Sequence, residues 1–453
     1  MKIIIAGLGK VGNTLARQLA AENDYDLTVV DRNAQVLQTV VENYDVLGVQ
    51  GNCAAMTTLV DAGVKDANLL IAVTDADEMN LLCCVTAHSL NPRIHTIARI
   101  RNPEYSDQVY KMRDLLALSM SVNPEKQAAI EIERLLKYPG FLKREPFAKG
   151  RMEIVELRVE PGSKLCNVAL NNLVDAVNCK VLVCAVTRGG ECIMPSGNFV
   201  LREGDKIFVT SESNNLTRLL KNLGIITRKV NRVLICGGGR ISYYLSQLLL
   251  KSGIQVQIIE NNPERCLMLA EQLPEADIIQ GDASSQALLE SEGLFSCDAL
   301  VSLTGLDELN VIIALYGSRH GVPQIITKVG HLEPNGILDT LPVGSLVCPK
   351  ELCSNGIVRY VRAMRNQTGA AITTHRIAGG RAEALEFRVD ENTRHRGEPL
   401  KSLKIKPNIL LVSINHASHV ELPNGDSCYQ TGDGVVIVTN GSETIYQLND
   451  IFA

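Results

Sequence analysis

Short apolar runs alternate with stretches of helical periodicity over the first hundred residues. The apolar runs lie at 3–6, 27–30, 46–49, 69–73 and 94–98. Helical spacing of the apolar positions is found near 11–22, 33–43, 54–62 and 78–90. Regular alternation of strand and helix predicts a parallel sheet with helices on both faces. We therefore expect an α/β, Rossmann-like unit that binds its ligand beyond the carboxyl ends of the strands.

The same pattern occurs a second time. Residues 3–12, an apolar run followed by a glycine-rich turn, recur 230 residues later as residues 233–242. Further pairs keep nearly this spacing: Asp31 with Glu260, Gln50-Gly51-Asn52 with Gln280-Gly281-Asp282, Thr74 to Asn80 with Thr304 to Asn310, and Arg158-Val159 with Arg388-Val389. A colinear series of this length predicts the internal duplication of a two-part module.

A smaller β-rich part follows each Rossmann pattern. Its apolar runs lie at 152–159, 180–186 and 206–210 in the first copy and at 384–389, 409–414 and 434–439 in the second. Turn signals such as Pro161-Gly162 and Gly204-Asp205 separate the runs. We expect Rossmann units at 1–123 and 231–350 and small α+β domains at 143–227 and 368–453.

The segment that leaves the first Rossmann unit has a helical pattern of its own. It runs from Pro124 to Lys137, and Tyr138-Pro139-Gly140 is expected to end it. A helix in this place could serve as a crossover between domains or as a dimerisation element.

Composition narrows the function classes. At 453 residues the chain exceeds a single core, so we expect three or four domains. A net charge of -5 gives no electrostatic reason to propose nucleic acid as a partner. No apolar stretch approaches the roughly 18 residues of a membrane span. Met1-Lys2 runs straight into an expected strand, so we expect no signal peptide.

The thirteen cysteines are scattered through apolar and helical runs without any C-x-x-C pair. We interpret them as reduced core residues of a cytosolic protein, with a redox sensor as the alternative. No spacing of metal ligands is recognised, so no metal site is predicted.

The glycine-rich turn of the first copy has the chemistry of a nucleotide site. Gly7 would permit the tight turn, Gly9 the close approach of a pyrophosphate, and Gly12 the packing of helix on strand. The positive end of the helix starting near Lys10 favours an anionic ligand. Asp31 can accept both ribose hydroxyls and would repel a 2′-phosphate, which favours NAD or an adenosine over NADP.

Two groups of charged residues near this turn allow alternative interpretations. Arg99 and Arg101 follow the fifth strand and could reach the phosphates, or could form a solvated pair on a loop. The cluster of Asp75, Asp77 and Glu78 could bind a cation. We prefer to read it as the acidic first turn of a helix, with Asp75 or Asp77 as the cap.

The second copy departs from the glycine pattern. Ser242 stands where the third glycine is expected, which loosens the helix–strand packing position. Glu260 keeps a carboxylate for the ribose, Lys328 takes roughly the place of Arg99, and Arg240 could contact a phosphate. This copy either binds a nucleotide or is a degenerate, structural half.

The ordered set of motifs resembles the tandem regulator-of-potassium-conductance (RCK) family over essentially the entire chain. The resemblance is carried by Gly7 to Gly12, Asp31, Gly51-Asn52, Thr74 to Asn80, Ala98 to Tyr105, Pro161 to Leu165 and Arg202 to Lys206. Departures are concentrated in the second Rossmann unit, at Ser242 and at Gly305 in place of Asp75. Because of these departures, equal affinity of the two sites for a nucleotide is in doubt.

The resemblance implies a regulatory protein on the cytoplasmic face of the inner membrane. Its partner would be an integral membrane potassium-translocating subunit of the Trk type, and copies of the chain would assemble as a dimer or tetramer into a ring. The ligand would be NAD(H), with ATP or ADP as further candidates. The implied contact residues are Gly7, Leu8, Gly9, Lys10, Val11, Gly12, Asp31, Val73, Thr74 and Arg99, and in the second copy Gly237, Gly238, Gly239, Arg240, Ile241, Glu260, Leu303, Thr304 and Lys328.

The alternative function is an NAD-dependent oxidoreductase. Such an enzyme needs a proton donor or acceptor beside the nicotinamide. None of the eight histidines has a recognisable catalytic context, and a domain of about 85 residues leaves little room for a substrate cleft. A second, slightly altered copy is also unusual for a dehydrogenase. We therefore expect a nucleotide-binding regulator rather than an enzyme, with the activating nucleotide and the ring stoichiometry left open.

Overall fold

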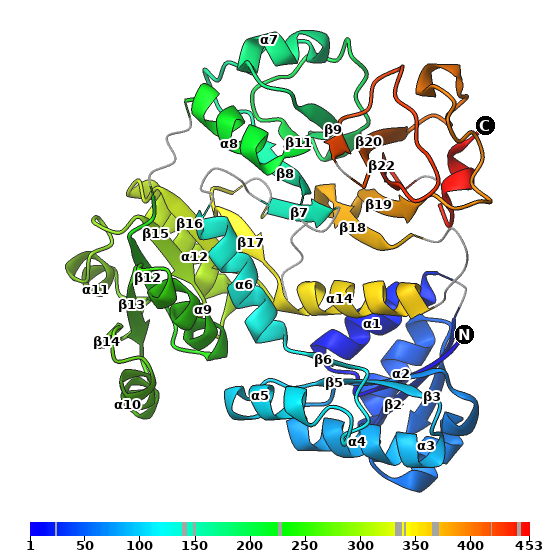
Figure 1. The fold of residues 1–453 in the computed structure, drawn as a ribbon. Coiled ribbons are helices and arrows are strands. Elements are labelled where there is room, and N and C mark those ends of the chain that lie inside the picture. Colours follow the sequence, from blue (N-terminus) through cyan, green and yellow to red (C-terminus); the bar gives the residue numbers. More distant parts are fainter. Residues whose placement is uncertain are drawn as a thin grey trace. The chain divides into compact units, whose positions relative to one another are not determined.

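The protein is described by a computed structural model that covers residues 1–22, 25–137, 143–147, 151–224, 229–330, 338, 341–364, 371–417, 419–441 and 445–453. These residues form two six-stranded and two five-stranded sheets (Figure 1). Among the helices in these ranges, none has the length and apolar character needed to cross a bilayer.

The first Rossmann unit is a parallel sheet with the strand order β3-β2-β1-β4-β5-β6. Its strands are β1 (Lys2–Ala6), β2 (Asp26–Asp31), β3 (Leu47–Gln50), β4 (Leu69–Ala72), β5 (His95–Arg99) and β6 (Met120–Val122). Its helices are α1 (Lys10–Ala20), α2 (Ala34–Asn43), α3 (Met56–Asp61), α4 (Asp77–Leu90) and α5 (Pro103–Lys111). The strand order reverses between β1 and β4, and open α/β sheets bind ligands beyond the carboxyl ends of the strands at such a reversal.

The second Rossmann unit repeats this topology in the order β14-β13-β12-β15-β16-β17. Its strands are β12 (Arg232–Cys236), β13 (Gln255–Glu260), β14 (Asp277–Gln280), β15 (Ala299–Ser302), β16 (Gln324–Lys328) and β17 (Ser345–Val347). Its helices are α9 (Arg240–Lys251), α10 (Pro263–Gln272), α11 (Gln286–Ser291) and α12 (Asp307–Arg319). The central strands β4 and β15 are buried at every residue because helices cover both faces of a parallel sheet. The predicted α/β fold class is confirmed.

The two small sheets also share one topology. The first has the order β10-β9-β11-β8-β7 and the second the order β21-β20-β22-β19-β18, read from the equivalent edge. The first comprises β7 (Lys143–Phe147), β8 (Met152–Arg158), β9 (Leu182–Arg188), β10 (Glu191–Ile193) and β11 (Lys206–Glu212), with α7 (Leu173–Val177) and α8 (Ser213–Asn222). The second comprises β18 (Thr373–Ile377), β19 (Ala382–Arg388), β20 (Ile409–Asn415), β21 (Val420–Glu421) and β22 (Gly434–Thr439).

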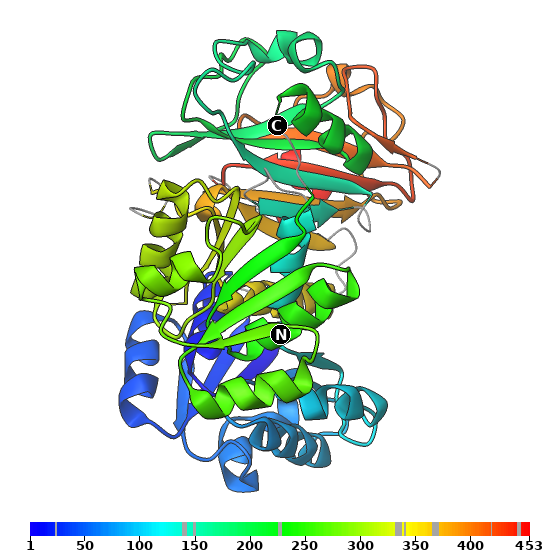
Figure 2. The ribbon, with the colours of Figure 1, turned by 90° about the vertical axis from the view of Figure 1, so that its left-hand side faces the viewer.

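The small sheets pack against each other through a shared apolar core (Figure 2). Buried residues from both sheets fill it, among them Phe147, Ile154, Cys184 and Phe208 from the first and Ile377, Ala384, Val412 and Val438 from the second. Each small domain also has an apolar cluster of its own, so the two copies jointly build one of the three cores of the β-rich parts that the described residues form.

The chain divides into two compact units that cut across the duplication. One comprises Met1–Ile130 with Cys348–Val361, and the other comprises Glu131–Val347 with Arg362–Ala453. The predicted helix at 124–137 is found as α6 (Pro124–Lys137), and its expected stop at 138–140 lies outside the described residues. The four domain boundaries given by the sequence stay a prediction.

The helix α14 (Pro349–Met364) explains the division. It follows the second Rossmann unit in the chain, yet most of it belongs to the first compact unit. There the amide of Gln18 on α1 donates to Asn355 on α14 at 3.1 Å. Nothing in the local sequence of α14 specifies this partner.

Candidate functional site

Two positions of the glycine-rich loop in the first copy leave no room for a side chain. Gly7 has φ +94°, and its N–H donates to the carbonyl of Val30 at 2.8 Å. A Cβ on Gly7 would lie 2.8 Å from the backbone of Thr74, and one on Gly12 would lie 1.9 Å from the oxygen of Gly7. These two glycines let β1, the end of β4 and α1 come together.

The middle glycine of the loop, Gly9, faces open space. A Cβ on Gly9 would meet no atom within 4 Å. Gly9 is the N-cap of α1, it supplies no side-chain cap, and the first turn of the helix carries no acidic residue. The amide groups and positive dipole end of α1 are therefore suited to a negatively charged ligand.

Asp31 closes the loop from the end of β2. Its Oδ2 accepts the N–H of Leu8 at 2.7 Å, and its Oδ1 accepts the N–H of Asn33 at 2.8 Å. Each carboxylate oxygen keeps a further lone pair for a hydroxyl donor. Asp31 thus positions the glycine loop as well as offering acceptors beside it.

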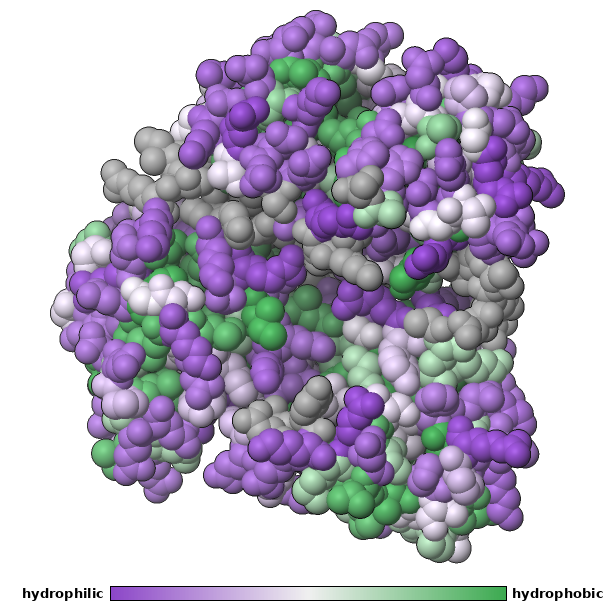
Figure 3. All heavy atoms as spheres, in the orientation of Figure 1, coloured by the Kyte–Doolittle hydropathy of each residue, from purple (hydrophilic) through white to green (hydrophobic). Residues whose placement is uncertain are grey.

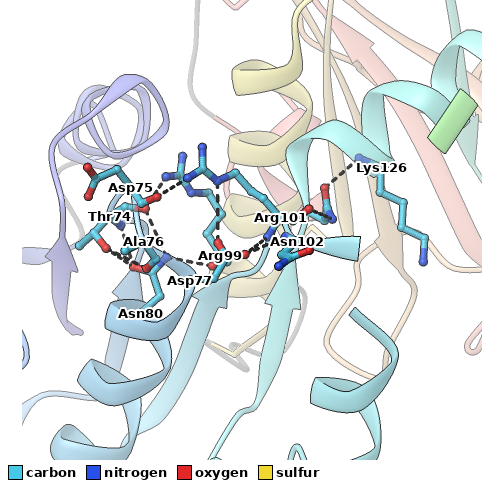
Figure 4. A network of polar contacts seen from close by, with 10 residues as sticks. Thr74, Asp75, Ala76, Asp77, Asn80, Arg99, Arg101, Asn102 and Lys126 are labelled. Carbon is cyan, nitrogen blue, oxygen red and sulfur yellow. Dashed lines mark hydrogen bonds and ion pairs between the residues drawn. The ribbon is translucent and has the colours of Figure 1, made fainter. Parts of the chain in front are cut away.

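A buried asparagine ties the ends of β4 and β5 together beside the loop (Figure 4). The Oδ1 of Asn80 accepts the N–H of Thr74 at 2.8 Å, and its Nδ2 donates to the carbonyl of Arg99 at 2.9 Å. The guanidinium of Arg99 donates to the carbonyl of Thr74. Burial, followed by the charge of Arg101, lowers the pKa of Arg99.

The acidic cluster after β4 supplies the acidic first turn of α4, with Asp77 and Glu78, as preferred on sequence grounds, but neither aspartate caps the helix. The N-cap of α4 is Ala76, without a side-chain cap bond. Asp77 instead accepts the N–H groups of Arg101 and Asn102, at 2.8 Å and 2.7 Å. The cap assignment for Asp75 or Asp77 is therefore wrong, because Asp77 lies inside the first turn and bonds the loop after β5.

Arg101 completes this clamp. Its guanidinium donates to the carbonyl of Asp75, and its Nε lies 3.8 Å from Asp77. The head group is therefore held against the loop after β4 rather than lying as a solvated pair with Arg99 (Figure 4).

The second copy repeats the main hydrogen bonds of this framework. Gly237 has φ +103°, and Glu260 accepts the N–H of Gly238 at 2.6 Å and that of Asn262 at 2.8 Å. Asn310 accepts the N–H of Thr304 at 2.8 Å and donates to the carbonyl of Lys328 at 3.1 Å. The Nζ of Lys328 donates to the carbonyl of Thr304, as Arg99 does to Thr74. Lys328 thus takes the structural place of Arg99.

Two residues distinguish the second loop from the first. Ser242 is buried, and its hydroxyl donates to the carbonyl of Gly237, so the helix–strand contact is made by a hydrogen bond. Arg265 on α10 donates from Nε to the carbonyl of Gly238 at 2.7 Å. Arg265 adds a cation to this loop that the first copy lacks, since Val36 occupies the corresponding turn of α2.

The remaining predicted contact residues fall into two groups. Leu8, Val11, Val73, Ile241 and Leu303 are buried, so they can meet a ligand through the backbone only. Lys10, Gly239 and Arg240 are exposed at the starts of α1 and α9. All of the predicted residues border the carboxyl ends of the two sheets.

Sequence reasoning gave no role to Asn80, Asn310 or Arg265. A signal existed for the asparagines, because Thr74 and Thr304 are each followed six residues later by asparagine. Nothing in the local sequence marks Arg265, whose contact arises only when α10 packs beside the loop.

Comparison with known proteins agrees with this geometry. The TrkA-N domain matches residues 3–119 and 233–349, and the TrkA-C domain matches residues 154–224. The chain belongs to the TrkA family. It is 31% identical to a Trk system potassium uptake protein TrkA homolog from Archaeoglobus fulgidus over 100% of both chains. It is 29% identical to the Trk system potassium uptake protein TrkA of Haemophilus influenzae, over 100% of this chain and 98% of that protein.

Solved structures support the fold. The GsuK RCK domain has a TM-score of 0.61 at 17% identity, over 97% of this chain and 92% of that one. A GsuK channel bound to NAD has a TM-score of 0.60 at 17% identity, over 97% and 77%. The resemblance to RCK proteins inferred from sequence is confirmed at the level of family and fold.

Proposed function

We propose that this TrkA-family chain is a nucleotide-binding regulatory subunit that gates an integral membrane potassium-translocating subunit of the Trk type. It would act from the cytoplasmic face of the membrane. The observation that carries the proposal is the first glycine loop, whose helix N-terminus opens around Gly9 while Asp31 stands beside it.

The residues of this loop fit the parts of a dinucleotide or adenine nucleotide. Asp31 has lone pairs left for the ribose hydroxyls. The amides at the start of α1 suit a pyrophosphate, because no acidic side chain competes with it there. Thr74 follows β4 and Arg99 ends the neighbouring β5, so both lie at the carboxyl end of the sheet. NAD(H), ATP and ADP all carry the ribose and phosphate groups that this set would recognise.

The second loop supports a site of different preference. Glu260 offers carboxylate oxygens as Asp31 does in the first copy. In addition, the positively charged side chain of Arg265 donates to the carbonyl of Gly238. A cation next to the phosphate position favours the more anionic ligand. We propose that the two copies bind nucleotides with unequal affinity.

A regulator fits these features better than an oxidoreductase does. The relatives are named as Trk system potassium uptake proteins, and one structural neighbour is a GsuK channel bound to NAD. The chain also contains two copies of the loop. Two ligand sites can act together in regulation, whereas an enzyme needs only one site for its reaction. An oxidoreductase would require a proton-transferring side chain at the nicotinamide end of the crevice.

Self-association into a ring is part of the proposal. Large apolar side chains are exposed on α3 and α4, with Met56 55% and Leu82 53% accessible, and Ile312 on α12 is 62% accessible at the position equivalent to Leu82. Figure 3 shows apolar surface over the part of the first Rossmann unit that carries α3 and α4. Exposed apolar side chains of this size are typical of a protein interface. Repetition of the feature in both copies suits a closed ring.

The site is connected to the helices that leave the first Rossmann unit. Asn123, the residue before α6, contacts the carbonyl of Arg101 at 3.5 Å, and its side chain accepts the N–H of Lys126 at 2.9 Å. A ligand that moves the end of β5 would therefore move the start of α6. A ligand that binds one conformation tenfold more tightly supplies about 1.4 kcal/mol per site, and several sites in a ring add.

The proposal is tested by potassium flux. The chain and its Trk-type membrane partner are reconstituted in vesicles, and flux is measured with and without NADH, NAD, ATP and ADP. We expect at least one nucleotide to change the flux by about tenfold, and the change to disappear without the chain. Flux that depends on the chain but on no nucleotide would contradict the proposal.

A further inference from the structure

Two histidines and two carboxylates meet at the edge of the second small sheet, far from the glycine loops in the sequence. His416 follows β20, His419 and Glu421 lie on the hairpin to β21, and Asp433 precedes β22. One ligand atom from each of His416, His419 and Glu421 lies within 4.8 Å of the others. We infer that these three residues form a binding site for Zn²⁺ in the TrkA-family chain, independent of nucleotide binding.

His416 has the geometry of a metal ligand whose ring is oriented by a carboxylate at the nitrogen that does not bind the metal. Its Nδ1 lies 2.9 Å from Oδ2 of Asp433, and its Nε2 lies 3.3 Å from Oε2 of Glu421. An imidazole that donates from Nδ1 to a carboxylate presents the lone pair of Nε2, which is the usual arrangement of zinc-bound histidines. Asp433 is fixed in turn, because it accepts the N–H of Gln430 at 2.8 Å.

Glu421 is positioned in the same way. Its Oε1 accepts the hydroxyl of Ser427, which leaves Oε2 turned to His416. Zinc bonds of 2.0–2.1 Å in a tetrahedral site separate the ligand atoms by about 3.3 Å. The distance of 3.3 Å between Nε2 of His416 and Oε2 of Glu421 already has this value.

His419 would supply the third bond. Its ring lies 4.8 Å from that of His416, tilted by 33°. A rotation that shortens this separation brings its nitrogen within reach of the ion. His419 is exposed, so a fourth position stays open to water.

The equivalent positions of the first small domain carry residues that do not form a metal site. The register pairs Ile193 with Val186 in the first copy and Glu421 with Ile414 in the second, so Glu421 replaces Ile193. On this register His416 replaces Arg188, which binds Asp205 through two hydrogen bonds of 2.7 Å.

His419 likewise replaces Glu191. All three ligands are thus particular to the second copy, whereas the supporting aspartate is present in both. A simple ion pair with Asp433 would need only the arginine of the first copy. All three positions differ between the two copies, and a bound metal ion explains why they differ together.

The chemical types of the three ligand side chains indicate which metal ion would bind. Two imidazoles with one carboxylate suit zinc and its neighbours, whereas Ca²⁺ and Mg²⁺ require oxygen ligands. Glu421 and Asp433 supply two negative charges that a divalent cation would neutralise. The residues on either side of Glu421, Val420 and Leu422, pack against the core shared by the two small sheets. A bound ion would therefore stiffen a hairpin next to that core.

The test is calorimetric titration of the reduced full-length chain with Zn²⁺. We expect one ion to bind, with affinity reduced at least about tenfold in His419→Ala and in Glu421→Gln. His395→Ala is the matched control, because His395 also pairs with a glutamate, Glu398 at 3.2 Å, in the same domain but outside the cluster. That variant should bind as the wild type does.

A second readout separates this site from cysteine binding. Zn²⁺ should raise the melting temperature of the wild type and of His395→Ala but not of His419→Ala, because a ligand stabilises only the state that binds it. Mg²⁺ should raise none of them. Absence of zinc binding to the wild type, or binding with unchanged affinity in His419→Ala, would overturn the inference.

Discussion

Alanine in place of Gly12 is expected to destabilise the first Rossmann unit and to abolish nucleotide binding there. The added Cβ would lie 1.9 Å from the backbone oxygen of Gly7. Backbone cannot move aside as a flexible side chain can, so α1 must shift away from β1. Overpacking of this kind costs about 1–3 kcal/mol, and the better helix propensity of alanine offsets about 1 kcal/mol of it. Thermal unfolding and calorimetric titration measure the two effects.

Gly9→Ala is the matched control for this prediction. Its Cβ meets no atom within 4 Å, and Gly9 has a φ of -64° that alanine adopts readily. The stability should change by less than about 1 kcal/mol, the cost of a weaker N-cap. Nucleotide binding should nevertheless fall, because the methyl group occupies the space that a phosphate would approach. Equal melting temperatures of the Gly12 and Gly9 variants would contradict the role given to Gly12.

Replacement of Asn80 by alanine is expected to have the second large effect. Asn80 is fully buried and bonds the N–H of Thr74 and the carbonyl of Arg99. The variant leaves both backbone groups unsatisfied, at about 1–3 kcal/mol each. It also frees the ends of β4 and β5 to move apart at the mouth of the crevice. We expect both stability and nucleotide affinity of the first unit to fall.

Asn43→Ala provides the comparison. Asn43 is exposed on α2, where its amide donates to the carbonyl of Thr39 at 2.7 Å. Such surface changes stay within about 0.5 kcal/mol. Denaturant unfolding of the two variants checks the prediction. A loss for Asn80→Ala no larger than that for Asn43→Ala would show that the buried bonds do not hold the strand ends together.

The features that could be predicted from the sequence are those determined by residues close together in the chain. The apolar runs place β1 to β5, the glycine pattern places the loop, and Asp31 ends β2 as the spacing predicts. The repeat extends this result to the second copy. The helix α5 was missed, although Asn102 accepts the N–H of Glu104 as its cap and Pro103 is its first residue.

The features that sequence could not place depend on contacts between distant segments. Asp77 looked like a helix cap, because nothing near it in sequence reveals the N–H groups of Arg101 and Asn102. The position of α14 against α1 depends on a pair separated by 337 residues, Gln18 and Asn355. Side-chain chemistry alone cannot choose among partners at such separations.

The measurement that tests the central claim most directly is calorimetric titration of the full chain with NADH, NAD, ATP and ADP, repeated on Asp31→Ala and Glu260→Ala. Each carboxylate holds the N–H of its glycine loop, Leu8 at 2.7 Å and Gly238 at 2.6 Å, and would accept the ribose. We expect each variant to lose binding in its own copy only, with different ligands affected. Unchanged affinity for every ligand in both variants would contradict the account.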